Sequence, residues 1–187
     1  MNPADVFAAE QLWWWVSRAT GIVALVCLAA SVLWGLVLHS RFLGSSATAA
    51  SLLDLHRWLA GLTVASTLAH MGALVADSFV SFTVADLLVP FASEWKPGPV
   101  AWGVLSFWLL AAVQLTSLLR RHVPPKVWRG VHLTSYLALA GGMVHAITAG
   151  TDADHPVAVI GLAAITGLVA ALTAWRSLVD RSAPAAA

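Results

Sequence analysis

The sequence predicts an all-α integral membrane protein, built as a bundle of five transmembrane helices. Of its 187 residues, 59% are hydrophobic and only 10% are charged, whereas soluble proteins carry about 25% charged residues. Five stretches are apolar over a length that can cross a bilayer, which takes about 20 residues in a helix. We expect one membrane domain at residues 12–179, with an outer segment at 1–11 and a cytoplasmic tail at 180–187.

The first span follows an acidic N-terminus that lacks the basic start of a signal peptide, so we expect this span to be retained. Proline-rich punctuation at 97–99 and at 124–125 precedes the third and fourth spans. The predicted spans cover about residues 12–38, 52–79, 100–119, 126–150 and 156–179.

Basic residues gather at one set of helix ends, and acidic residues gather at the other. Because cytoplasmic loops carry the excess of Lys and Arg, we expect a plasma (cytoplasmic) membrane protein with its N-terminus outside and its C-terminus in the cytoplasm. Only Arg18 and Lys96 fall on the outer side. The inner side holds Arg41, Arg57, Arg120, Arg121, Lys126, Arg129, Arg176 and Arg181.

Four histidines lie inside two of these apolar spans. His56 and His70 are fourteen residues apart in the second span, and His132 and His145 are thirteen apart in the fourth. In a helix these spacings amount to ~21 Å and ~19.5 Å, which fit within a hydrocarbon core of ~30 Å. The predicted orientation pairs His56 with His132 near the inner surface and His70 with His145 near the outer surface.

The two spacings differ in helical phase. At ~100° per residue, fourteen residues place His56 and His70 on one face, while thirteen leave His132 and His145 ~140° apart. A bend or a π-bulge between them would bring them onto one face. We expect it at Gly141 and Gly142.

Paired histidines at two depths indicate a particular metal chemistry. Imidazole suits zinc, copper and iron, but a zinc site takes three or four protein ligands. Two histidines at each level instead suit haem iron with both axial positions filled. We therefore expect a five-helix bundle holding two stacked haems b, the inner one on His56 and His132 and the outer one on His70 and His145.

Three arginines are candidate partners for the haem propionates. Arg57 follows His56, and Arg129 lies one turn before His132. Two roles are open for both: contact with a propionate, or a charge that fixes the topology. Arg18 lies inside the first span near the expected depth of His70, where we expect it to contact the outer haem or an acceptor beside it.

Aromatic residues mark the expected outer interface. The tryptophan run at 13–15 suits the outer end of the first span. The long apolar connection at 81–97 is expected to lie along the interface, with Phe82, Phe91 and Trp95 at headgroup level.

The stretches LHRWLAG at 55–61 and VHLTSY at 131–136, with the histidine spacings, resemble the ferric reductase-like transmembrane domain. That superfamily includes NADPH oxidases, ferric reductases, STEAP proteins and MsrQ-type haem subunits. The resemblance covers about residues 12–179. It implies two haems b that pass electrons across the membrane, from a cytoplasmic flavin to an outer acceptor. Arg18 is similar to an arginine that lies beside the outer haem of the oxidases.

Two departures from that family refine the expectation. The sequence has no Gly-rich dinucleotide fingerprint, so flavin and NAD(P)H are expected only on a separate cytoplasmic flavoprotein. Leu74 stands where the oxidases carry a further histidine, which argues against dedicated superoxide production. The chain is thus expected to be the haem-containing membrane component of an oxidoreductase.

We expect an outer electron acceptor, which is ferric iron, oxygen, a quinone or a redox protein, and membrane lipid as the surroundings, with no nucleic-acid partner. Two alternatives stay open. One is a quinone-linked cytochrome b, and the other is a haem-free transporter or scaffold whose histidines are structural.

Overall fold

The computed structural model of the chain describes residues 3–39, 48–78, 80–151 and 154–182, and the regular structure within these ranges is helical. The basic residue Arg41 and most of the predicted cytoplasmic tail lie outside them. The helices are α1 (Pro3–His39), α2 (Thr48–Ala76), α3 (Val84–Leu88), α4 (Pro97–Leu118), α5 (Pro125–Leu133), α6 (Ser135–Ala149) and α7 (Pro156–Ser182).

Four of these helices are long and apolar enough to cross a membrane. They lie in α1, α2, α4 and α7, at the places where the first, second, third and fifth spans are predicted. Their membrane-compatible portions are Gln11–Leu38, Ala50–Ala76, Pro97–Leu118 and Pro156–Trp175. The prediction of an integral membrane helical protein is therefore confirmed.

The fourth predicted span is divided into α5 and α6, which meet at Thr134. There the chain makes a tight turn, because both the backbone N–H and the hydroxyl of Thr134 donate to the carbonyl of Val131, at 3.0 and 2.7 Å. Neither helix alone has the length of a span, so a single fourth helix is not observed.

This break corrects the expected position of the bend. Helix α6 runs without interruption through Gly141 and Gly142, and the break lies at Thr134, directly after His132 and Leu133. Gly141 has a different role. A β-carbon there would collide with the hydroxyl of Ser106 on α4, so the glycine allows α4 and α6 to pack closely.

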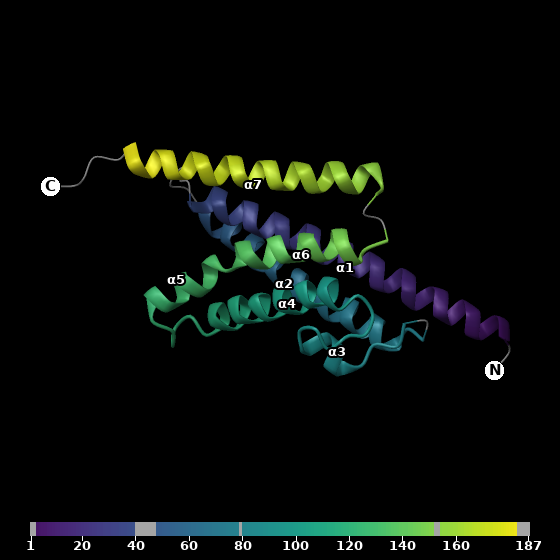
Figure 1. The fold of residues 1–187 in the computed structure, drawn as a ribbon. Helices are drawn as coiled ribbons and strands as arrows, with labels where there is room; N and C mark the ends of the chain where they lie inside the picture. Colours follow the sequence, from purple (N-terminus) through teal and green to yellow (C-terminus); the bar gives the residue numbers. More distant parts are fainter. Residues whose placement is uncertain (1–2, 40–47, 79, 152–153, 183–187) are drawn as a thin grey trace.

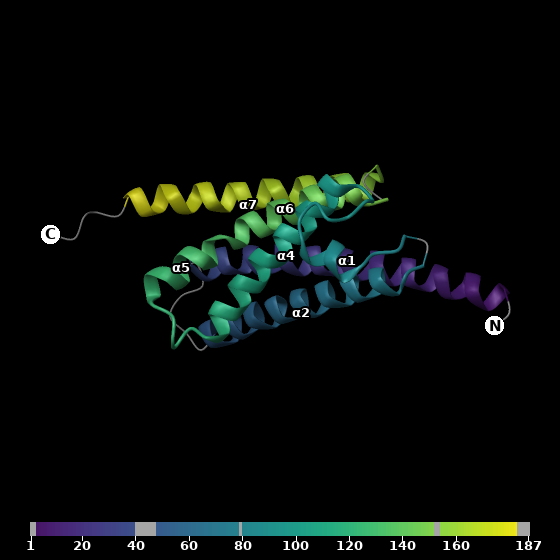
Figure 2. The ribbon, with the colours of Figure 1, turned by 60° about the horizontal axis from the view of Figure 1, so that its bottom comes forward.

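The long helices form two closely packed pairs. Backbone packing is extensive between α1 and α2, and between α4 and α6, whereas α2 and α6 make at most marginal backbone contact in the described residues. Figures 1 and 2 show these helices running along a common direction. Each of the two helices α2 and α6 therefore packs mainly on its own partner and little on the other.

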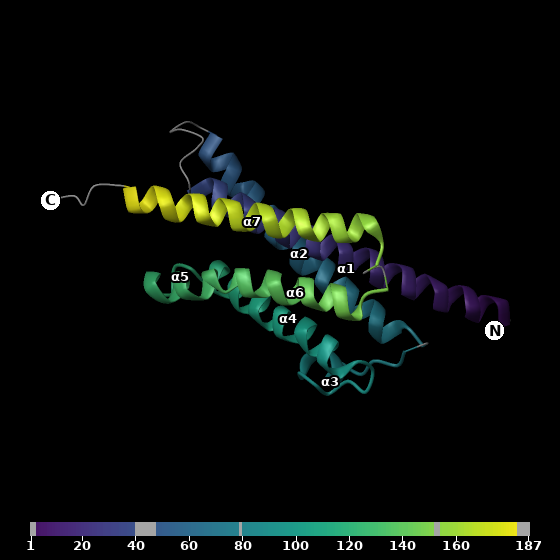
Figure 3. The same cartoon turned by 45° about the horizontal axis from the view of Figure 1, so that its top comes forward.

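Helix α7 runs along the outside of the bundle (Figures 1 and 3) and packs against α1. Ile165 and Val169 of α7 contact the buried cluster of Ala29, Val32 and Leu139. Most other apolar side chains of α7 are exposed, as expected for a helix that faces lipid.

The connection between α2 and α4 contains α3, which the sequence analysis missed. Thr83 and Asp86 close a capping box at its start. Phe82 was predicted at headgroup level but is buried, with only 8% of its surface exposed, in a cluster with Leu87 and residues of α4. Phe91 is 68% exposed, as an interfacial position requires. The inward turn of Phe82 follows from the short helix, which folds the connection back onto the bundle.

The two ends of the bundle differ in what they carry. Helix α5 and the C-terminal end of α7 lie at one end, and α3 and the N-terminal end of α1 lie at the other (Figure 1). The basic residues of the connection before α5 therefore share an end with the C-terminal part of α7.

Candidate metal centres

The four predicted histidines come together in two pairs. The ring centroids of His56 and His132 are 6.0 Å apart, and those of His70 and His145 are 6.3 Å apart. Each pair joins α2 to the α5–α6 segment, and all four side chains are half-buried. The structure thus pairs His56 with His132 and His70 with His145, as the sequence analysis predicted.

The separation within each pair fits one metal ion held between two imidazoles. A metal–nitrogen bond is ~2.0 Å, and the ring centre lies ~1.1 Å beyond the nitrogen, so two linear ligands have centroids ~6.2 Å apart. Both observed separations are within a few tenths of an ångström of that value. Among the described residues, no three His, Cys, Asp or Glu side chains gather to hold a metal ion, which agrees with two protein ligands per level.

Three of the four rings occupy the same kind of surroundings, which we call a ring seat. A ring seat is a backbone carbonyl that accepts from Nδ1, with a glycine four residues later that leaves room for the ring. For His70, the carbonyl of Ser17 lies 2.6 Å from Nδ1, and Gly21 lies behind the ring. The other two seats are Ser31 with Gly35 for His56, at 3.0 Å, and Pro99 with Gly103 for His145, at 2.9 Å.

The seats determine which ring nitrogen is available to a metal. A carbonyl oxygen only accepts, so Nδ1 carries the proton and Nε2 keeps a free lone pair. A second hydrogen bond of this kind is usual for metal-ligating histidines, since it fixes the ring and raises its basicity. Three of the four side chains therefore leave Nε2 available to a metal ion.

His132 has different surroundings. Its Nδ1 is buried and has no hydrogen-bond partner among the described residues. The ring instead stacks on Trp128, one turn earlier on α5, with centroids 4.9 Å apart and planes 25° apart. The guanidinium of Arg120 lies 4.4 Å from the centre of the Trp128 ring.

The three predicted arginines lie in different settings. Arg18 is half-buried, with its guanidinium 4.1 Å from the centre of the Trp14 ring, and it follows Ser17, whose carbonyl holds His70. Arg57 is exposed and forms an ion pair with Asp54 at 3.1 Å. Arg129 is exposed on α5. Only Arg18 is thus both shielded and adjacent to a ring seat.

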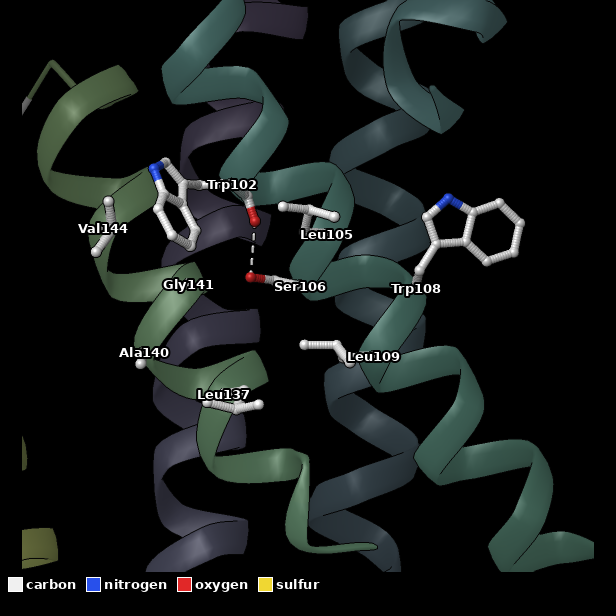
Figure 4. Close-up of a pocket in the computed structure, with 9 residues that line it drawn as sticks. All are labelled: Trp102, Leu105, Ser106, Trp108, Leu109, Leu137, Ala140, Gly141 and Val144. Carbon is white, nitrogen blue, oxygen red and sulfur yellow. Dashed lines mark hydrogen bonds between the residues drawn. The ribbon is translucent and has the colours of Figure 1, made fainter. Parts of the chain in front are cut away.

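An apolar groove of about 550 Å³ lies on the α4–α6 pair (Figure 4). Ser106 is its one hydroxyl side chain, and that hydroxyl already donates to the carbonyl of Trp102 at 2.8 Å. The groove is lined by Trp102, Leu105, Ser106, Trp108, Leu109, Leu137, Ala140, Gly141 and Val144. None of the four histidines lines it, so the groove is separate from the metal centres.

The ring seats were not predicted from the sequence, although the sequence contains a signal for two of them. Gly21 and Gly35 are fourteen residues apart, the same spacing as the histidines they support. A glycine pair with the ligand spacing, on the helix before the ligand helix, therefore indicates where the rings rest. Trp128 was also missed, and its position four residues before His132 is the corresponding signal.

Comparison with known proteins gives one match. The protein-family model described as ferric reductase like transmembrane component matches residues 20–143, which are 124 of the 187 residues. The matched segment contains His56, His70 and His132, while His145 and Arg18 lie just outside it. No curated protein and no solved structure matches the chain.

Proposed function

The chain belongs to the family of ferric reductase-like transmembrane components, and on that premise we propose that it carries electrons across the membrane through two bis-histidine haems b. The inner haem is held by His56 and His132, and the outer haem by His70 and His145. Electrons enter at the inner haem from a cytoplasmic donor and leave from the outer haem to an acceptor on the outer side.

One observation carries this proposal. Two histidine pairs, at 6.0 and 6.3 Å between ring centroids, lie one above the other between helices that do not pack directly on each other. Along α2 the two levels are ~21 Å apart. Structural histidines have no reason to repeat a metal-sized separation at two depths.

The proposed topology has five crossings, with α5 and α6 acting together as the fourth. With Thr134 between them they cover residues 125–149, which are 25 residues, or ~37 Å at the helical rise, more than a hydrocarbon core of ~30 Å. The N-terminus is outside and the C-terminus in the cytoplasm, as the distribution of Lys and Arg favours for the plasma membrane.

The protein's own residues orient and insulate the redox groups. When bound, haem iron supplies reversible one-electron transfer. The ring seats hold three imidazoles with Nε2 available, and the apolar helices keep water from the path. Arg18, half-buried beside Ser17, offers a positive charge at the outer level for a propionate or an incoming acceptor.

Arg57 and Arg129 are the inner-level candidates for propionate contact. Arg57 must first leave Asp54, and an exposed ion pair of this kind contributes only about 0–1 kcal/mol. Arg129 is exposed on α5, one turn before His132. Both also suit the positive-inside pattern, so a propionate role is tested by the potential of the inner haem in each Gln variant.

The proposed partners lie on opposite sides of the membrane. A cytoplasmic flavoprotein that carries the NAD(P)H-derived electrons is the donor, and ferric iron, oxygen, a quinone or a redox protein is the acceptor. Four basic residues around α5 offer a docking surface for an acidic donor, and we call it the basic surface: Arg120, Arg121, Lys126 and Arg129.

The test is a haem count together with an absorption spectrum. The purified full-length chain, expressed with ample haem supply, should yield two haems b per chain by pyridine haemochrome. It should also give a low-spin reduced-minus-oxidised spectrum with two redox components. One haem or none per fully loaded chain contradicts the proposal, and a colourless protein supports the transporter or scaffold alternative.

The quinone-linked alternative is separated by a second measurement. The α4–α6 groove is apolar, and two of the donors among its lining residues are already engaged, the Ser106 hydroxyl with Trp102 and the Trp108 indole with Leu88. We therefore expect quinone-site inhibitors to leave flavoprotein-driven haem reduction unchanged. Inhibition at micromolar concentration would instead favour a quinol-oxidising cytochrome b.

A further inference from the structure

The four histidines are not held alike. His56, His70 and His145 each donate Nδ1–H to a backbone carbonyl, at 2.6 to 3.0 Å. The buried Nδ1 of His132 has no partner among the described residues. The difference lies within the inner pair, because His56 is seated and His132 is not.

The missing seat has a structural reason on α4. The seat of His145 uses Pro99 and Gly103, so a second seat fourteen residues later would use the carbonyl of Val113 and a glycine at 117. That position is Ser117, which accepts the indole N–H of Trp128 at 3.4 Å. A seat at this level of α4 therefore lacks its glycine, and the serine that stands there is hydrogen-bonded to Trp128.

Trp128 takes the place of a seat. Its ring stacks against the His132 ring with centroids 4.9 Å apart. Its own position is fixed by the hydrogen bond to Ser117 and by Arg120 over its face. Stacking restrains the plane of the imidazole, but it supplies no acceptor for Nδ1–H.

The absent hydrogen bond has a chemical consequence. An acceptor on the outer ring nitrogen raises the basicity of the ligating nitrogen and locks the ring direction. An imidazole that lacks this acceptor is the weaker donor to a metal and is freer to leave. His132 also lies two residues before the break between α5 and α6 at Thr134.

We propose that His132 is the exchangeable ligand of the inner centre, and that Trp128 is the positioning residue that keeps it in place. A small ligand with a free lone pair, carbon monoxide on reduced iron or imidazole on oxidised iron, takes the position of His132. One iron–nitrogen bond breaks, one bond to the incoming ligand forms, and no electron changes hands. The outer centre, with both rings seated, stays closed. This inference rests on the proposed haem function.

The test measures carbon monoxide binding to the dithionite-reduced, full-length protein in detergent, after the haem count. Wild-type protein should bind carbon monoxide at one of its two haems. The responding component should be the one that is lost in His56→Ala and retained in His70→Ala, which assigns it to the inner level. Carbon monoxide should raise the midpoint potential of that component only.

Variants of Trp128 test its positioning role. Trp128→Ala should accelerate carbon monoxide binding by about tenfold, in line with the effect of removing a residue that orients a metal ligand. Trp128→Phe keeps a stacking ring and should remain close to wild type. Ser117→Ala removes only the acceptor of the indole N–H and should fall between them, and it serves if Trp128→Ala does not fold.

The matched control is Trp108→Ala. Trp108 is also an indole whose N–H donates to a protein oxygen, the carbonyl of Leu88 at 2.8 Å, but its ring contact is with Phe107 and not with a histidine. Its substitution should leave carbon monoxide binding unchanged.

Each outcome decides between the two claims. A protein without haem overturns the proposed function and this inference with it. If both haems bind carbon monoxide, or if neither does, the inference is overturned while the proposed haem function stands. The same holds for a Trp128→Ala variant that binds at the wild-type rate, or one that opens the outer component instead.

Discussion

Gly21 of α1 lies directly behind His70 of α2, so that a β-carbon at Gly21 would be 3.0 Å from Nδ1 of the imidazole. The same relationship joins Gly103 to His145, at 2.9 Å, and Gly35 to His56, where the nearest ring atom is at 3.4 Å. The rings rest against backbone with no room for a methyl group in the two outer cases. The glycines therefore fix how closely each ring approaches its carbonyl.

Alanine at Gly21 or Gly103 should selectively weaken the outer centre. The added methyl group must push the ring away from its carbonyl, and overpacking of this kind costs about 1–3 kcal/mol. We expect outer-haem affinity to fall by about tenfold, which corresponds to 1.4 kcal/mol, with the inner component intact. Redox titration of each variant, with haem content measured alongside, checks this.

The matched control is Gly61→Ala on α2. A β-carbon there has no neighbour within 4 Å, so the change should leave both haems unaltered. Thermal stability should be equal to wild type or higher by up to about 1 kcal/mol, since glycine is the weaker helix former. Equal loss of haem in Gly61→Ala and Gly21→Ala would mean that the seats have no special role.

Much of this architecture can be predicted from the sequence. The length of the apolar stretches predicts the long helices. The distribution of Lys and Arg predicts the topology, and the topology predicts the pairing of His70 with His145. The position of the break could not be derived, because Gly141 and Gly142 are the better helix breakers by propensity. In the structure they serve helix packing instead, and the hydroxyl and N–H of Thr134 form the turn.

The ring seats were harder to foresee for a physical reason. The accepting group of a seat is a main-chain carbonyl, such as that of Ser31 or Pro99. Every residue has such a carbonyl, so the sequence does not indicate which one is used. Burial of Phe82 was missed because an aromatic residue suits an interface and a core equally well, and α3 decides between them. Only the glycine half of a seat, such as Gly35, is visible in the sequence.

Each single-histidine variant should affect the redox component of one haem level and not the other. His70→Ala or His145→Ala should remove the outer component and leave the inner one, because each ring faces only its partner at that depth. His56→Ala should remove the inner component and leave the outer one, and His132→Ala should affect mainly the inner component. Loss of the same component in His70→Ala and His132→Ala would show that the pairing is wrong.

Arg18 should act on the outer acceptor more than on the donor. Its guanidinium lies against Trp14, and Arg18 directly follows Ser17, whose carbonyl holds His70, at the end opposite the basic surface. In oriented vesicles, Arg18→Gln should slow reoxidation by an impermeant anionic ferric complex by about tenfold, an electrostatic effect of the size seen for steered association. Reduction from the cytoplasmic face should be unchanged.

Arg121→Gln is the control for that measurement, because it removes an exposed arginine from the opposite end of the bundle. It should leave reoxidation at the outer face as in wild type. An Arg18→Gln variant that reoxidises at the wild-type rate removes Arg18 from the acceptor path.

The last prediction concerns the donor. Arg121 and Lys126 belong to the basic surface and are exposed, and neither contacts the Trp128–His132 stack in the interactions observed. A double Arg121→Gln and Lys126→Gln variant should therefore weaken docking of an acidic flavoprotein without disturbing the inner haem. We expect the second-order rate of haem reduction to fall by about threefold to tenfold at low salt.

The difference should shrink as ionic strength rises, since the screening length is ~10 Å at 0.1 M and ~3 Å at 1 M. Stopped-flow reduction across a salt series measures both effects, and unchanged absorption spectra and potentials confirm that the centres are intact. If the rate and its salt dependence match wild type, the basic surface fixes topology and does not receive the donor.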